Sequence, residues 1–125
     1  MKINLLNKKS KNEFYNSKEW RETRDEMLQK QPYCIGCLYF GKQTPSTTVH
    51  HIIKFYDQDD DIKNLLLTDK ENLVCLCQAC HNDIHRKKKY THPLMQQYLY
   101  DVKNYLCSKY IGYGIIIKWT NDKNK

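Results

Sequence analysis

Side chains recur at helical spacing in two long segments of the chain. In the first, residues 16–30, the recurring positions fall at i, i+4, i+7 and i+8, which is the spacing of one helix face. They are occupied by Trp20, Arg24, Met27 and Leu28. We expect Asn16 to cap this helix, with Glu19 at its third position as in a capping box. Pro32 marks its end.

A second long helix is predicted to open with Pro93, because the first helical position tolerates a residue without an N–H. One face of this helix is predicted to comprise Leu94, Tyr98, Val102, Tyr105 and Lys109, flanked by Leu99 and Leu106. Gly112 and Gly114 end the helix. We expect the face to pack against the rest of the domain, and a dimer interface is the alternative.

Shorter apolar runs predict two strands and a third helix between these segments, and a last strand after them. Residues 47–53 and 73–76 predict strands, residues 79–89 a helix, and residues 115–119 a terminal strand. Residues 65–68 are ambiguous. Residues 54–63 carry four clustered aspartates but no EF-hand pattern, so they predict a solvated, mobile loop.

Cysteine spacing predicts a structural zinc site. Two Cys-x-x-Cys pairs have the spacing of its two halves: Cys34 with Cys37, and Cys77 with Cys80. Four thiolates would close a tetrahedron around zinc, so this metal would hold shape and not catalyse. Gly36 is expected to ease the turn inside the first pair.

Cys75 is a rival to Cys77 as a zinc ligand, but only Cys77 completes the two-residue spacer with Cys80. Cys75 and Cys107 are therefore expected to be free, buried thiols.

Histidines supply a second set of candidate ligands. His81 and His85 are four residues apart, so on a helix they lie on one face and can bind one metal. His50 and His51 are neighbours on the first predicted strand, and Asn72 precedes the second. Neighbouring strand residues point to opposite faces, so His50 and His51 cannot share one role, and their spacing does not show which one binds metal.

The order of these residues resembles the HNH nucleases, also called the ββα-metal or His-Me finger family. The two Cys-x-x-Cys pairs, with FYNSKEW upstream, are similar to small phage and prophage members, and VHHI and HNDIH to colicin-type nuclease domains. The resemblance covers residues 14–88. It implies an α+β fold, in which a small ββα-metal core is clamped by the four-cysteine zinc site and flanked by N- and C-terminal helices.

The resemblance also implies a function and residue roles. The function is a metal-dependent DNA endonuclease that hydrolyses phosphodiester bonds and leaves a 5′-phosphate and a 3′-hydroxyl. His50, His81 and His85 would bind the catalytic metal, although His85 has a phosphate contact as its alternative. His51 would be the general base, and Asn72 would hydrogen-bond backbone near His51. Imidazole ligands favour Mn²⁺, Ni²⁺, Co²⁺ or Zn²⁺ over Mg²⁺ as the catalytic metal.

Length and charge agree with this hypothesis. The 125 residues suit one domain, which we divide into a basic flexible arm (1–12), an HNH nuclease domain with its C-terminal helix (13–111), and a terminal strand with a polar tail (112–125). The net charge of +7 suits DNA, with basic clusters in the arm and at residues 86–89. No apolar run approaches the length of a membrane span, so we expect a cytoplasmic protein.

Two other functions remain open at this level. One is a non-catalytic, zinc-dependent DNA-binding module. The other is an accessory factor of phage DNA packaging that assists a terminase, which rests on analogy with the family alone.

Overall fold

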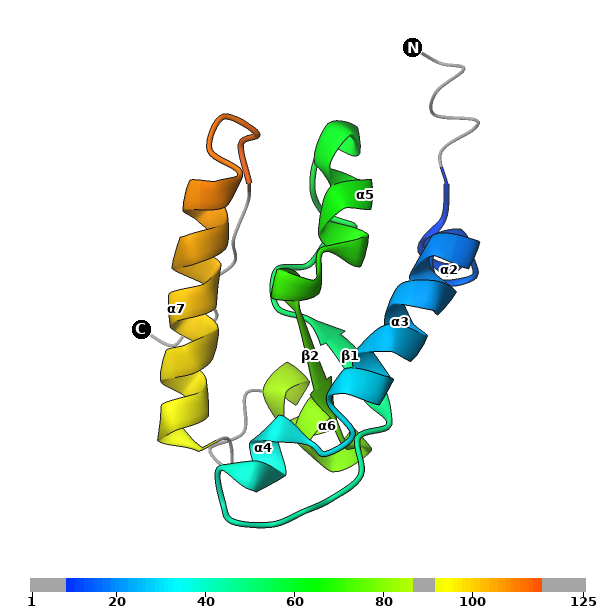
Figure 1. The fold of residues 1–125 in the computed structure, drawn as a ribbon. Helices are drawn as coiled ribbons and strands as arrows, with labels where there is room; N and C mark the ends of the chain where they lie inside the picture. The colour runs from blue at the N-terminus through cyan, green and yellow to red at the C-terminus, as the bar shows by residue number, and fades with distance from the viewer. Residues whose placement is uncertain (1–8, 87–91, 116–125) are drawn as a thin grey trace.

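The computed structural model describes residues 9–86 and 92–115. Its elements in chain order are α2 (Lys11–Tyr15), α3 (Lys18–Lys30), α4 (Ile35–Leu38), β1 (Thr48–His51), α5 (Asp60–Thr68), the 3₁₀ turn η1 (Lys70–Asn72), β2 (Leu73–Leu76), α6 (Gln78–Arg86) and α7 (Pro93–Lys109). Strands β1 and β2 form an antiparallel hairpin at the centre, with the helices around it (Figure 1). The predicted α+β fold class is confirmed.

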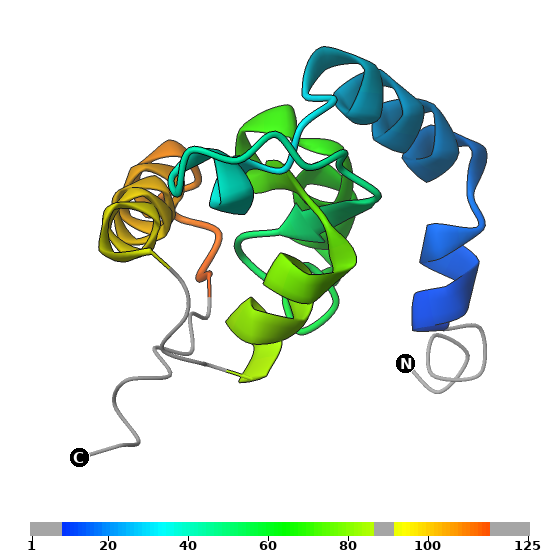
Figure 2. The same cartoon turned by 90° about the horizontal axis from the view of Figure 1, so that it is seen from below.

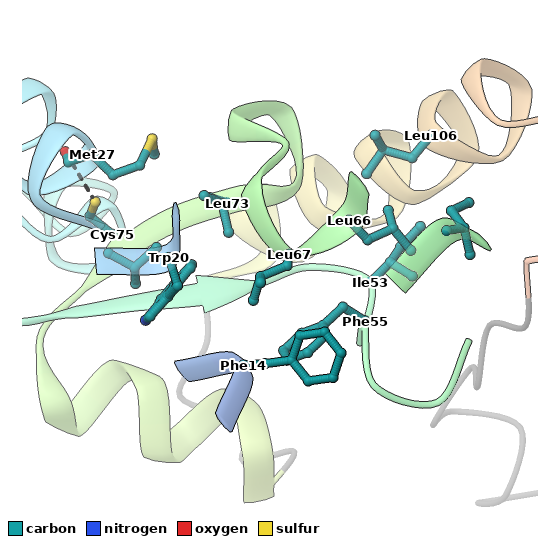
Figure 3. Packing of buried hydrophobic residues seen from close by; sticks show 12 residues of the cluster. Phe14, Trp20, Met27, Ile53, Phe55, Leu66, Leu67, Leu73, Cys75 and Leu106 are labelled. Atoms are coloured by element: carbon teal, nitrogen blue, oxygen red, sulfur yellow. Dashed lines mark hydrogen bonds between the residues drawn. The ribbon is translucent and has the colours of Figure 1, made fainter. Parts of the chain in front are cut away.

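The two faces of the hairpin pack against different helices. Val49, Leu73 and Cys75 belong to one buried cluster, together with residues of α2, α3 and α5 (Figure 3). Val74 and Leu76 belong to a second cluster, together with Cys34 and with Met95 of α7. The alternation follows from the period of a strand, in which successive side chains point to opposite faces. In the pairing register His50 lies opposite Val74 and His51 opposite Leu73, so the two histidines are directed to different sides of the hairpin.

The first long helix begins later than predicted. Ser17 caps α3, and its Oγ accepts a hydrogen bond from the Trp20 N–H at 3.2 Å. Asn16 instead ends the short helix α2, so the predicted capping box at this position is wrong. A capping box does exist one helix earlier, between Ser10 and Glu13. As a result, α2 begins inside the segment predicted as a flexible arm.

The aspartate-rich segment predicted as a loop is helical from residue 60. Asp59 is the N-cap of α5, and Asp60 and Asp61 lie in its first turn. Carboxylates are stabilised there by the positive end of the helix dipole. Ile62 and Leu66, four residues apart, are fully buried on the inner side, which anchors the helix on the core.

The face of α7 differs from the prediction. Leu94 is 63% exposed and Tyr105 is 49% exposed, so both lie outside the core. The packed face consists of Met95, Tyr98, Leu99, Val102 and Leu106. Tyr98, Val102 and the two flanking leucines therefore pack as predicted, while Met95 takes the place expected of Leu94. The helix does open at Pro93, as predicted.

Several predicted segments lie partly outside the described residues: 1–8 of the basic arm, 87–89 of the third helix, and 116–125 of the terminal strand and polar tail. Within the part of the chain that is described, no helix has both the length and the apolar character that crossing a membrane requires.

Candidate active site

Four cysteines form a compact cluster between α4 and the start of α6. Cys34 is the N-cap of α4, and Cys37 lies inside that helix. Cys77 directly follows β2, and Cys80 is in the first turn of α6. The four Sγ atoms lie within 4.8 Å of one another. The hairpin therefore brings together two pairs that are forty residues apart in sequence.

The cluster fits a zinc ion. Zn–S bonds of about 2.3 Å in a tetrahedron put the sulfurs about 3.8 Å apart. The Cys37 Sγ lies 3.9 Å from that of Cys77 and 3.8 Å from that of Cys80. Burial raises the pKa of the Cys34 and Cys80 thiols, so thiolates at these two positions need a nearby cation to balance their charge. These sulfur distances suggest zinc at the cluster, and the assignment of the individual ligands stays a prediction.

Gly36 has a different role from the one predicted. Gly36 lies within helix α4, and its φ is not positive. Its backbone therefore needs no conformation that only glycine adopts easily. A Cβ at this position would lie 2.9 Å from the Cys80 Sγ. Glycine is therefore required for space beside the cysteine cluster.

The two remaining cysteines lie outside the cluster. Cys75 is fully buried on the other face of the hairpin, where its Sγ contacts the Met27 carbonyl oxygen at 3.4 Å. Cys107 is only half-buried on α7, contrary to the expectation that it is buried.

Three histidines form a second cluster. His50 of β1 meets His81 and His85 of α6, and their ring nitrogens lie within 4.8 Å of one another. The Nε2 atoms of His81 and His85 are 2.9 Å apart. The centre of the His50 ring lies 5.2 Å from the centre of each of the other two rings. Ligand nitrogens around one metal with bonds of about 2.0–2.1 Å lie at similar separations. The donor set therefore fits a divalent metal with coordination positions left open.

Burial favours the neutral form of all three imidazoles. Burial lowers the pKa of His50 to about 3, and the charges of His81, His85, His51 and Lys103 lower it further. Burial also lowers the pKa of His81 and of His85. Neutral imidazole is the form that binds metal. His85 is the exposed member, so the cluster opens toward solvent on its side.

His51 lies on the opposite face of β1 and takes no part in this cluster. It is 7% exposed and packs 4.8 Å from the rings of Trp20 and Phe55. Its Nε2 lies 2.9 Å from the Leu67 carbonyl oxygen. A carbonyl only accepts, so Nε2 carries the proton and Nδ1 is the basic nitrogen. Burial lowers the pKa of His51 to about 4, although the Leu67 carbonyl opposes this shift.

Asn72 is fully buried, and its side chain hydrogen-bonds both the segment after β1 and helix α5. Its Oδ1 accepts from the Ile53 N–H at 2.7 Å, and its Nδ2 donates to the carbonyls of Ile53 and Leu66 at 3.0 and 3.1 Å. Ile53 comes two residues after His51, which agrees with the expectation of a backbone contact near that histidine. The contact with α5 had no sequence signal, because a backbone carbonyl can belong to any residue type.

Two comparisons with known proteins find matches to this chain. An HNH endonuclease family profile matches residues 34–87. The crystal structure of the HNH endonuclease of the deep-sea thermophilic bacteriophage GVE2, with a manganese ion, is 34% identical in sequence. The match covers 70% of this chain and 87% of that one, with a TM-score of 0.49. No curated protein matches the chain. By the profile and the sequence identity, the chain belongs to the HNH endonuclease family, enzymes that cleave phosphodiester bonds.

Proposed function

We propose that this HNH endonuclease is a metal-dependent DNA nuclease. In this proposal His50, His81 and His85 hold the catalytic metal, and His51 is the general base. The observation that carries the proposal is that two neighbouring histidines of β1 are directed to opposite faces of the hairpin. His50 is directed to a cluster of imidazoles, while the neighbouring His51 has one nitrogen anchored and the other basic.

The chain's own residues account for the proton transfer. The Leu67 carbonyl holds the Nε2–H of His51, which leaves Nδ1 to take a proton from a water molecule. The imidazolium formed in this step is stabilised at the C-terminal end of α5, where the helix dipole is negative. Burial keeps His51 unprotonated at neutral pH, so the base is ready before substrate binds.

A divalent metal at the three histidines would neutralise charge on the phosphate and on the leaving oxygen. Manganese fits an imidazole donor set, and the similar bacteriophage endonuclease was crystallised with manganese. We propose that Mn²⁺, Ni²⁺ or Co²⁺ supports cleavage at lower concentration than Mg²⁺, with zinc confined to the cysteine cluster as a structural ion.

The test is nicking of supercoiled plasmid by chelator-treated protein whose structural zinc has been verified, with each metal titrated separately. Nicking that saturates at lower manganese than magnesium supports the proposal. Robust cleavage with micromolar magnesium and none with transition metals would show that the three histidines do not form the metal site. No cleavage with any metal would favour the non-catalytic DNA-binding module.

A role beside a phage terminase is a second proposal, favoured by the similarity to a bacteriophage endonuclease. Binding of the purified chain to a terminase large subunit, measured by calorimetry, tests it. Absence of binding at micromolar concentrations would remove this partner and leave the nuclease proposal unaffected.

A further inference from the structure

Three lysines from different parts of the chain carry charges that act on histidines of the cluster. Lys11 begins α2, Lys54 follows β1, and Lys103 lies on α7. In Figures 1 and 2 α6, which carries two of the histidines, lies between α7 and α2. The helices that carry Lys103 and Lys11 therefore lie on opposite sides of α6. Both lie outside the segment that the family profile matches.

Packing places Lys103 on the metal-site face of the hairpin. Its neighbour Val102 packs against both buried clusters, and Met95 of the same helix is buried beside Val74. Val74 is the partner of His50 across the hairpin. Helix α7 thus covers the face from which His50 reaches the cluster, and Lys103, half-buried, follows the packed stripe.

Electrostatic effects agree with a position of the three lysines near the histidines. Lys103 is among the charges that act on His50, after burial and the other histidines. After burial, Lys54 and then Lys11 lower the pKa of His85. Lys54 also acts on Lys103, whose pKa burial lowers most. Because salt screens charges beyond about 10 Å, such effects require proximity. Lys54 therefore lies close enough to act on both His85 and Lys103.

On the other side of the site, an aromatic ring helps to place Lys11. The Lys11 Nζ lies 5.9 Å from the centre of the Tyr56 ring. Tyr56 follows Lys54 by two residues in the chain. The charge of Lys54 acts against that of Lys103. A polyanion lying beside both ammonium groups would reduce this repulsion.

We propose that Lys103, Lys54 and Lys11 bind the DNA phosphates that flank the scissile phosphate, along a path from α7 past the histidine cluster to α2. This inference rests on the proposed DNA nuclease function and deepens it. The lysines position the strand, while the metal site and His51 act on the scissile bond.

The test measures binding and cleavage separately. Lys103→Gln and Lys54→Gln are compared with Lys30→Gln, which removes the same charge from the exposed end of α3, a helix on the other face of the hairpin. Affinity for a short fluorescent DNA duplex is measured against salt concentration with chelator-treated protein. We expect each site variant to reduce the slope of log K against log salt by about 0.9, and Lys30→Gln to leave it unchanged. Lys103→Arg should restore the slope, because arginine keeps the charge.

In the cleavage arm, Lys103→Gln should weaken half-saturation by DNA while single-turnover cleavage at saturation stays within about threefold of wild type. Hydrolysis of bis(p-nitrophenyl) phosphate, which has no flanking phosphates, should be unchanged. Equal salt slopes for Lys103→Gln, Lys54→Gln and Lys30→Gln would overturn the inference and show ordinary surface charge. Wild-type protein that binds DNA with the expected slope but nicks no plasmid would overturn the nuclease function and leave the lysine contacts standing.

Discussion

His51 and Asn72 are bound to consecutive carbonyl oxygens in the last turn of α5. His51 Nε2 contacts the carbonyl of Leu67, and Asn72 Nδ2 donates to that of Leu66. Carbonyls in the last helical turn have no partner within the helix, so both side chains complete its C-terminal end. Asn72 therefore fixes the helix end that carries the acceptor of the proposed base, and this helix end links the two residues.

Replacing Asn72 should disturb this acceptor without changing packing. Asn72→Asp has nearly the same shape but no Nδ2 donors, and it places a buried carboxylate against the carbonyls of Ile53 and Leu66. We expect the free energy of unfolding to fall by about 2–4 kcal/mol and cleavage to be lost. Urea unfolding and plasmid nicking check both. Unchanged stability would show that these buried bonds contribute little.

Comparing alanine variants of Gly36 and Gly41 separates the effect of lost space from the effect of backbone conformation. Gly36→Ala places a Cβ 2.9 Å from the Cys80 Sγ, although alanine favours the helix in which it stands. Gly41→Ala has open space but a φ of 79°. We expect Gly36→Ala to release its zinc to a chelator faster than wild type. Gly41→Ala should lose stability by about 1 kcal/mol and retain zinc. Equal zinc release from both variants would contradict the role of Gly36.

The six cysteines should divide into two groups by their effect on folding. A four-thiolate zinc contributes folding free energy on the order of 10 kcal/mol. Cys34→Ser should therefore yield unfolded or insoluble protein, and Cys75→Ser should fold with its zinc content intact. Circular dichroism and elemental analysis check this. A native spectrum with unchanged zinc in Cys34→Ser would contradict the ligand assignment.

Stability should fall on the acid side of neutrality. Burial lowers the pKa of His51 from 6.5 to about 4, so between these values the unfolded chain binds a proton that the folded chain does not. The free energy of unfolding therefore decreases as pH falls from 6.5 toward 4. His50 contributes in the same direction, with its pKa lowered to about 3.

The variant His51→Gln isolates one of these contributions. It removes one titrating group and keeps a donor for the Leu67 carbonyl, while the cysteine cluster and His50 are shared with wild type. Urea midpoints of the chelator-treated proteins, with zinc verified, should fall less with pH in this variant than in wild type. Parallel pH profiles would show that His51 titrates normally in the folded protein.

The elements that could be predicted from the sequence are those marked by a pattern within a few neighbouring residues. Leu73–Leu76 is a strand at the predicted positions, and α7 starts at Pro93 because proline favours a first turn. The cysteines and histidines were recognisable by spacing, since a metal constrains which residues meet. Helix α5 was missed because aspartates favour both loops and helix N-termini. The carbonyl of Leu67 and the position of Lys103 depend on tertiary packing and have no local pattern.

The central claim is that neighbouring histidines on β1 divide metal binding from proton transfer. The most direct measurement compares His51→Gln with His50→Ala, by manganese binding and by plasmid nicking on the same chelator-treated preparations. His51→Gln should bind manganese as wild type does and cleave about 10²–10⁴-fold more slowly, because only the general base is lost. His50→Ala should lose manganese binding and cleavage together. Wild-type cleavage by His51→Gln, or loss of manganese in that variant with retention in His50→Ala, would contradict the account.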